Sequence, residues 1–248
     1  MIAHAIFADG PLPSTVDDPR WATTERTDVR LRNAVTPAGE WAHPPTVRAV
    51  SFRILYNQEA VAFRFTWDDS SQDLNRTIAG LPDGFALSLK PSGSQGDVVS
   101  LQAWPYAGSP QLDLCYWSAD TNQASETVAM DWDHVLQRQS PQALLKSVSH
   151  YDDGRWFLVL QRPLHPVSPE GAAAIVEGRF ASVGLAVWDG ANANARAVSP
   201  WVDLVLRRTV QPVAPQESGT GAVRVAIILG VAVLVLWLVL RNRATPRS

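Results

Sequence analysis

The sequence predicts an all-β fold, an antiparallel β-sandwich followed by a C-terminal single transmembrane helix. Between residues 47 and 206, short stretches of alternating apolar and polar residues recur, with turn residues between them. The 18 prolines and 15 glycines favour many turns over long helices. Near the C-terminus, the uncharged run Val225–Leu240 has no polar face to turn to water, which is typical of a membrane-spanning helix.

Composition and motifs exclude several classes of function. A net charge of −3 argues against nucleic-acid binding, which needs a basic face. Cys115 is the single cysteine, so the sequence predicts neither an intrachain disulfide nor a cysteine metal cluster. No G-x-S-x-G or H-E-x-x-H motif occurs, and the five histidines are scattered. We therefore expect an accessory protein without catalytic residues rather than an enzyme.

The N-terminal stretch from residue 12 to residue 46 is expected to be rich in loops. Asp18 and Pro19 predict a turn, and Trp21 just after it is interpreted as an aromatic side chain that covers a core. We expect this segment to wrap around the sandwich without contributing chemistry.

The first predicted strands, Val47–Tyr56 and Ala60–Trp67, form a hairpin. In the second strand, a period of two turns Arg64 toward solvent or a partner and the larger apolar residues toward a core. The acidic turn Asp68–Ser71 closes this strand. Its oxygens could bind Ca²⁺, but a solvated turn is the favoured interpretation, because the ligand spacing of known calcium loops is missing.

Seven further strands complete a set of about nine. Asp152–Gly154 between two of them predicts a tight hairpin turn, because glycine tolerates a positive φ. The stretch Gly171–Ile175 is interpreted as one helical turn. The predicted strands are Phe85–Lys90, Val98–Trp104, Leu112–Trp117, Leu144–Tyr151, Arg155–Arg162, Arg179–Trp188 and Pro200–Leu206.

The predicted organisation is a sandwich over residues 1–208, a flexible tether over 209–222, a transmembrane helix over 223–241 and a short basic tail over 242–248. Arg241, Arg243 and Arg247 at the C-terminal end of the apolar run outweigh Arg224 at its start, which favours a periplasmic main domain on a single-pass protein of the cell membrane. The N-terminus does not read as a signal peptide, so a cytoplasmic main domain stays open as the alternative.

A series of aromatic-rich stretches follows one another in a distinctive order. They are Asp18–Trp21, Leu55–Asn57, Ala60–Asp69, Pro82–Leu87, Leu112–Asp120, Gly154–Trp156, Gln161–Leu164, Ala186–Ala191 and Val198–Trp201. In this order they resemble the haem-b-binding gamma subunit of ethylbenzene dehydrogenase and its relatives among molybdoenzymes of the dimethyl sulfoxide reductase type. The resemblance implies a sandwich that holds one haem b and passes single electrons between an iron–sulfur subunit and an outside partner. Its implied partners are the catalytic and iron–sulfur subunits of such a complex, together with the lipid bilayer.

The same resemblance assigns the haem ligands to two positions that depart from the family. The family holds its iron with a methionine and a lysine, and those positions carry Ala107 and Arg196 in this chain. Alanine has no ligand atom, and arginine stays protonated without a free lone pair. Three interpretations stay open: the haem is absent, or it is held differently, or the alignment is shifted. Tyr106 and Arg196 are the candidate haem-pocket residues, Met130 is the candidate metal ligand, and one of the histidines is a further possible substitute ligand.

Two functions are carried forward. The first is a membrane-anchored haem b electron-transfer subunit of a molybdoenzyme-like respiratory complex, or a purely structural descendant of one. The alternative is a membrane-tethered module that binds carbohydrate or another ligand, with exposed tryptophans as stacking platforms. Among the ten tryptophans, Trp41 and Trp104 are the candidates for that role.

Overall fold

The computed structural model of this chain describes residues 1–34, 46–75, 81–90, 101–102, 104, 111–130, 135–137, 145–166, 172–192 and 195–208. Met1–Thr209 forms one compact unit. Its regular structure consists of strands and two short 3₁₀ helices, so the all-β prediction is confirmed for the described part. The elements are β1 Ile2–Phe7, η1 Pro19–Thr23, β2 Thr27–Arg30, β3 Arg32–Asn33, β4 Ala49–Tyr56, β5 Ala60–Asp68, β6 Gly84–Leu89, β7 Leu112–Ser118, β8 Gln123–Ala129, β9 Val135–Gln137, β10 Lys146–Asp152, β11 Arg155–Pro163, β12 Phe180–Asp189, η2 Gly190–Asn192, β13 Ala195–Val198 and β14 Val202–Arg207.

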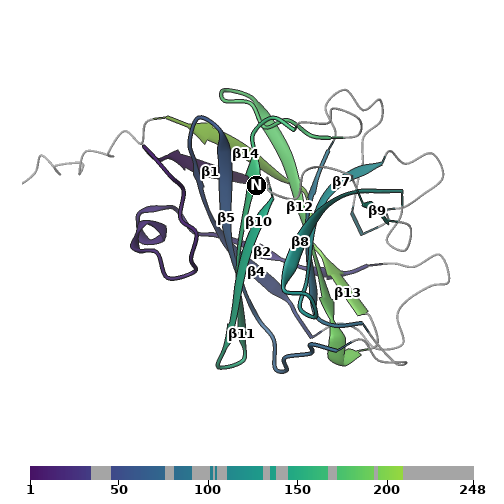
Figure 1. Cartoon of the computed structure of the whole chain (residues 1–248). Coiled ribbons are helices and arrows are strands. Elements are labelled where there is room, and N and C mark those ends of the chain that lie inside the picture. The colour runs from purple at the N-terminus through teal and green to yellow at the C-terminus, as the bar shows by residue number, and fades with distance from the viewer. Residues whose placement is uncertain are drawn as a thin grey trace, which may run out of the picture. The chain divides into compact units, whose positions relative to one another are not determined.

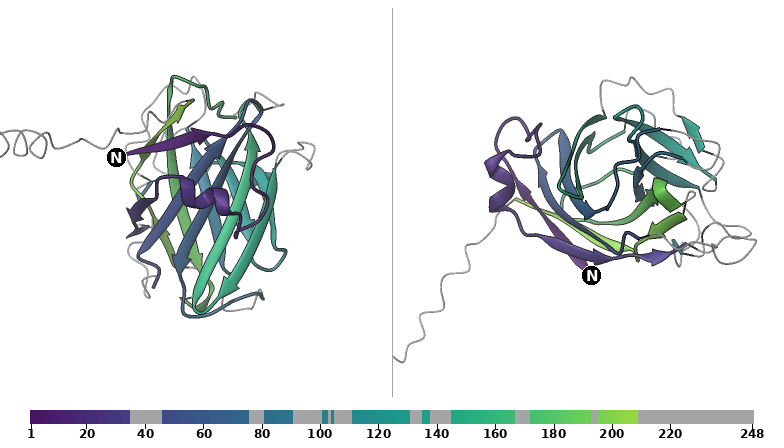
Figure 2. Two further views of the ribbon diagram at one scale, coloured as in Figure 1. Left: turned by 90° about the vertical axis from the view of Figure 1, so that its left-hand side faces the viewer. Right: turned by 90° about the horizontal axis from the view of Figure 1, so that it is seen from below.

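The strands form one continuous sheet rather than two separate antiparallel ones. Its order is β10-β11-β5-β4-β1-β14-β12-β6-β7-β8-β9, with β2, β3 and β13 attached beside this path. The sheet curls back on itself, so that its two halves face each other (Figures 1 and 2). Near the ends of the path, the Ala124 amide on β8 donates to Ser147 Oγ on β10 over 2.9 Å. The predicted sandwich is therefore right in its two layers and wrong in treating them as separate sheets.

Strand β1 connects the two halves, and it is parallel to both of its neighbours. Ile2–Ile6 pairs with residues 203–207 of β14, and Ile6 and Phe7 pair with Leu55 and Tyr56 of β4. The other strand pairs are antiparallel. The expectation of a purely antiparallel arrangement is therefore wrong at this one strand.

The interior between the two halves is filled by aromatic and branched side chains, as the alternation in β5 predicts. Phe65 of β5 lies 4.4 Å, centroid to centroid, from Phe85 of β6 in the opposite half. Trp67 approaches Trp117 and Trp156, both at 6.2 Å. Aromatic contacts of this kind stabilise a core beyond the area that they bury. The core-facing residues Val61, Phe63, Phe65 and Trp67 are all buried, so this prediction is confirmed.

A buried ion pair also links the two halves across this core. Arg162 on β11 donates from Nη1 and Nη2 to Asp113 Oδ2 on β7, each over 3.2 Å. Ala173, in the connection before β12, donates its amide to the same oxygen over 2.8 Å and accepts from Arg162 Nη2 over 2.9 Å. The connection between β11 and β12 is thus fixed to the interior by hydrogen bonds.

The described N-terminal segment packs on the outer face of β4, β5 and β11, and the prediction that Trp21 covers a core is confirmed. Trp21 in η1 is buried against Leu55, Ala62 and Val159. Its Nε1 donates to the Thr15 carbonyl over 3.0 Å. Asp18 caps η1 by accepting from the Arg20 amide over 2.9 Å.

Of three further predictions, one turn is confirmed, while a strand and a helical turn are wrong for the described residues. The Asp153–Gly154 turn joins β10 and β11 with positive φ angles of 46° and 72°, as the sequence predicts. The described part of Val98–Trp104 (residues 101, 102 and 104) is not a strand, and the described part of Gly171–Ile175 is not a helical turn. Ile175 instead donates its amide to the Leu164 carbonyl as an extended connection.

The membrane anchor is a separate matter. No helix among the described residues has the length and apolarity needed to cross a membrane. The predicted tether, helix and basic tail at 209–248 lie outside the described residues, so they stay predictions.

Candidate functional site

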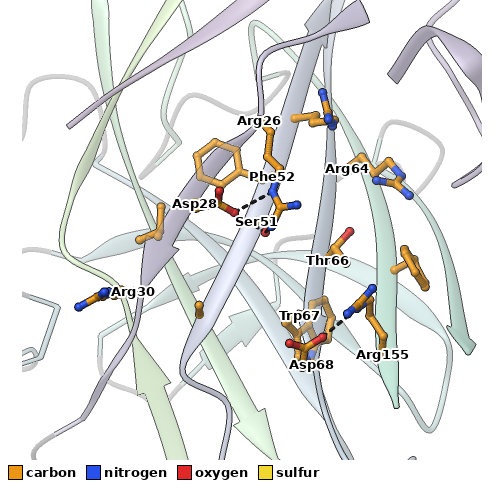
Figure 3. Close-up of a pocket in the computed structure, with 14 residues that line it drawn as sticks. Arg26, Asp28, Arg30, Ser51, Phe52, Arg64, Thr66, Trp67, Asp68 and Arg155 are labelled. Atoms are coloured by element: carbon orange, nitrogen blue, oxygen red, sulfur yellow. Dashed lines mark hydrogen bonds and ion pairs between the residues drawn. The ribbon is translucent and has the colours of Figure 1, made fainter. Parts of the chain in front are cut away.

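An open groove of about 530 Å³ lies on the outer face of β2, β4, β5 and β11. Figure 3 shows that its labelled residues come from these strands or, for Arg26, from just before β2, and that the polar ones lie on one face of the strands. Five arginines line it against two aspartates. The arginines are Arg26, Arg30, Arg53, Arg64 and Arg155, and the aspartates are Asp28 and Asp68.

Two arginines lie directly opposite each other across β4 and β5. Arg53 pairs with Arg64 in the antiparallel register. Arg53 donates to the Thr24 carbonyl, and Arg64 Nε donates to the Val16 carbonyl over 2.7 Å. The Arg64 guanidinium also lies 5.3 Å from the centre of the Phe157 ring. Burial, followed by the charge of Arg53, lowers the pKa of Arg64, so a bound anion would relieve an unfavourable pairing.

Ion pairs hold the two rims of the groove. Arg26 Nε and Asp28 Oδ1 are 2.8 Å apart, and Ser51 Oγ donates to the same oxygen over 2.6 Å. Arg155 Nε and Asp68 Oδ1 are 2.8 Å apart on the other side. Planar guanidinium groups recognise carboxylates and phosphates, so the groove can bind an anionic group or an acidic protein surface.

The structure places Arg196 in a buried strand, not on the solvated loop that would otherwise be expected of an arginine. It lies in β13 with 5% of its surface exposed, opposite Trp188 of β12. Its backbone carbonyl accepts from the Ala34 amide over 3.0 Å. Tyr106 and Ala107, the other positions taken from the family, lie outside the described residues.

Met130 does not join Arg196 at one site. It follows β8 and is 48% exposed. In the sheet, β12, β6 and β7 lie between β13 and β8, which separates the two residues by roughly 19 Å at about 4.8 Å per strand. One iron ion cannot be held by both.

The apolar cluster around Arg196 tests whether the described residues fit a haem. None of its described members has the thioether, imidazole, thiolate or amine that usually ligates haem iron, and Tyr116 brings the only phenol. The described members of this cluster therefore do not themselves supply the methionine and lysine that the resemblance implies. The members are Ala34, Ala86, Leu101, Trp104, Leu112, Leu114, Ala129, Ala186, Trp188 and Val198, with Tyr116 and Trp201 packed against them.

The tryptophans also correct one expectation. Trp104 is fully buried in this cluster and cannot be an exposed stacking platform. Trp41 lies outside the described residues. Trp201 is partly exposed, but Lys90 Nζ lies 5.1 Å from the centre of its ring. No tryptophan among the described residues thus offers an open face of the kind that stacks on sugar rings.

Three buried aspartates form a separate cluster where β5 and β12 end and β6 begins. Asp69, Asp83 and Asp189 each present an oxygen, and these oxygens lie within 4.8 Å of one another. Burial, followed by the Asp83 carboxylate, raises the pKa of Asp69 to about 7. Burial also raises the pKa of Asp83.

This cluster overturns the expectation of a solvated turn at Asp68–Ser71. Asp68 is exposed as expected, but Asp69 is only 3% exposed. Sequence reasoning missed Asp83 and Asp189 as neighbours of Asp69, because they lie 14 and 120 positions after it in the chain. Both precede a glycine at the end of a strand, Asp83-Gly84 and Asp189-Gly190, and Gly84 pairs with Trp188. A shared Asp-Gly signal at the ends of two paired strands is the pattern that would have found them.

Comparisons with known proteins agree with the all-β fold, and one of them bears on the haem-subunit hypothesis. No protein family profile matches the chain. A Haloferax mediterranei protein named "Putative respiratory nitrate reductase heme subunit ORF7" is 24% identical over 239 residues, which covers 91% of this chain and 82% of that protein.

Among solved structures, a family 9 carbohydrate-binding module from Caldicellulosiruptor kristjanssonii in complex with glucose is similar, with a TM-score of 0.53 and 8% identity. The likeness covers 87% of this chain and all of that module. A cellotriose complex of a family 9 module from the same organism has a TM-score of 0.49. At 8% identity the module in complex with glucose shows a shared fold alone, while the Haloferax protein is a distant relative along most of its length.

Proposed function

We propose that this chain is a membrane-anchored accessory subunit of a molybdoenzyme-like respiratory complex, of the haem b electron-transfer type. The observation that carries the proposal is the distant likeness to a protein named as a haem subunit of respiratory nitrate reductase, which spans 91% of the chain.

The chain's own residues would contribute binding and positioning. The arginine groove would contact an acidic surface of a partner subunit, because its guanidinium groups outnumber its carboxylates. The predicted helix at 223–241 would hold the sandwich at the bilayer, and the tether at 209–222 would set its reach. A haem b, when bound, would supply one-electron transfer. Its two axial ligands would not be Arg196 and Met130 together, because the sheet separates these residues.

Purification of the detergent-extracted full chain from its own cells tests the proposal. We expect a large molybdenum-containing subunit to co-purify and a reduced-minus-oxidised absorption spectrum to show a haem b signal. A co-purifying complex without haem would leave the structural version of the role. A chain isolated without any companion subunit would contradict the proposal as a whole.

The same preparation also tests the carbohydrate-binding alternative. Titration with a panel of sugars, followed by tryptophan fluorescence, would reveal it as a saturable change. We expect no such change, because the described tryptophans are buried or, at Trp201, covered by Lys90.

A further inference from the structure

The three-aspartate cluster has more negative charge than its surroundings neutralise. Asp69, Asp83 and Asp189 are 3%, 1% and 1% exposed. Among the described residues, none of the three forms an ion pair with a lysine, an arginine or a histidine. Buried carboxylates without a partner are costly, and like charges at this separation oppose each other's ionisation.

Hydrogen bonds hold the three carboxylates in place, but two of their oxygens accept no hydrogen bond from the described residues. Asp83 accepts from Trp156 Nε1 over 3.1 Å and from the amides of Asp73 and Gly190, each over 2.9 Å. Asp189 Oδ2 accepts from the Thr46 amide over 2.8 Å and from the Thr46 hydroxyl over 2.6 Å. Asp69 Oδ2 and Asp189 Oδ1 are buried, and no group of the described residues donates a hydrogen bond to either.

The backbone around the cluster is tight, so its geometry is fixed. A Cβ atom at Gly190 would lie 2.6 Å from Asp73 Cβ and 2.9 Å from the Leu81 carbonyl oxygen. The Asp69 backbone is held as well, because its amide donates to the Gly154 carbonyl over 2.9 Å and its carbonyl accepts from Tyr151 Oη over 3.0 Å. A preorganised set of oxygens at fixed spacing is what a metal site requires.

We propose that Asp69, Asp83 and Asp189 bind one Ca²⁺ ion. Carboxylate oxygens are hard ligands, and two oxygens on opposite sides of a Ca²⁺ at about 2.4 Å lie about 4.8 Å apart, as the cluster allows. The ion neutralises the buried charge and uses the two oxygens that lack donors. Mg²⁺ fits less well, because it needs a compact octahedron at about 2.1 Å and keeps several waters.

The site bridges the two facing halves of the sheet. Asp69 follows β5 in one half, while Asp83 and Asp189 border β6 and β12 in the other. The Trp156 indole of β11 contacts Asp83 from the first half. Bound Ca²⁺ therefore fastens the ends of both halves, so its main effect is on stability, independent of any haem.

The test compares the detergent-extracted full chain in EGTA with the same chain in CaCl₂ and in MgCl₂. We expect one calcium per chain by elemental analysis after gel filtration. We also expect CaCl₂ at 100 times its Kd to raise the melting temperature, followed by tryptophan fluorescence, by on the order of 5–10 °C. No bound calcium and no shift in the wild-type chain would overturn the proposal. An equal shift with MgCl₂ would overturn the assignment to calcium.

Asp69→Asn and Asp189→Asn test the ligands. Each is expected to lose the calcium shift, yet to be at least as stable as the wild type in EGTA, because one buried charge is removed. If the two aspartates only held the fold through hydrogen bonds, both variants would instead be less stable than the wild type in EGTA. Asp68→Asn is the matched control, since Asp68 is the exposed neighbour of Asp69, and it should keep the full shift. A full shift in both ligand variants would overturn the site, and if one variant fails to fold, the other and the direct calcium measurement decide.

Discussion

The Arg162 and Asp113 side chains lie in the interior, 1% and 0% exposed. At such a site the attraction between the two charges must offset the free-energy cost of removing both from water. The Arg162→Met substitution would leave the Asp113 carboxylate buried without its cation. We expect the free energy of unfolding to fall by about 3–5 kcal/mol, measured by urea denaturation. The double substitution R162M/D113L should lose less than R162M, because it removes both charges together.

Arg155→Met is the control for that experiment. Arg155 pairs with Asp68 at the surface, where both side chains are at least half exposed. An exposed pair contributes about 0–1 kcal/mol, so the loss should be small. If Arg162→Met cost no more than Arg155→Met, the interior pair would not hold the two halves together as described.

Single residues differ in how well the sequence predicts their place. Phe63, Phe65 and Arg64 were predictable, because alternation in a strand depends only on immediate neighbours. Asp69 was not, because its burial depends on Asp83 and Asp189, which approach it only after the sheet has formed. The strand that buries Arg196 was not predicted for a related reason: the short, alanine-rich stretch Ala195–Val198 shows too little pattern to be recognised as a strand.

Among the elements, β1 connects the two halves of the sheet. Ile6 pairs with Leu55 on one side and with Arg207 on the other. We expect Ile6→Pro to lower the free energy of unfolding by about 1–3 kcal/mol, because proline removes a ladder hydrogen bond and leaves its acceptor unsatisfied. Thermal unfolding followed by circular dichroism measures the loss.

Ile6→Val is the matched substitution, since it keeps the amide and a β-branched side chain. It should change stability little. If Ile6→Pro left the unfolding temperature where Ile6→Val leaves it, β1 would not be a structural part of the sheet.

The sequence predicts the strands in which apolar and polar residues alternate clearly. It misses those that are strands only because they pair with their neighbours. β4, β5, β10 and β11 alternate clearly and were found within about two residues. β8, with the polar sequence QASETVA, has partly exposed side chains and was missed. β1 was considered only as a segment that lacks the features of a signal peptide, and its six residues gain stability from β4 and β14 rather than from their own pattern.

For the whole molecule, the predicted anchor is testable without its structure. The full chain should stay with membranes after washing at alkaline pH, because the run Val225–Leu240 is uncharged. A chain that ends at Thr209, the boundary of the compact unit, should be released into solution and keep its fold. Release of the full chain by the wash would contradict a membrane-spanning helix.

The arginine groove makes a second prediction at this scale. Arg30→Glu with Arg155→Glu should reduce the yield of co-purifying partner subunits about tenfold or more, if the groove meets an acidic surface. Arg179→Glu reverses an exposed charge that is not among the groove residues, and it should leave the yield unchanged. Equal loss in both would mean that overall charge, and not the groove, governs association.

The seam between β1 and β14 also dictates an order of events during synthesis. Residue 2 cannot meet its partner at residue 203 until almost the entire domain has been made. Until then, β1 and β12 present unpaired edges, which are prone to stick to other chains. Nascent chains that stall before residue 202 should therefore aggregate, and closure by the final strand should be the slow step of folding, because such distant contacts form late.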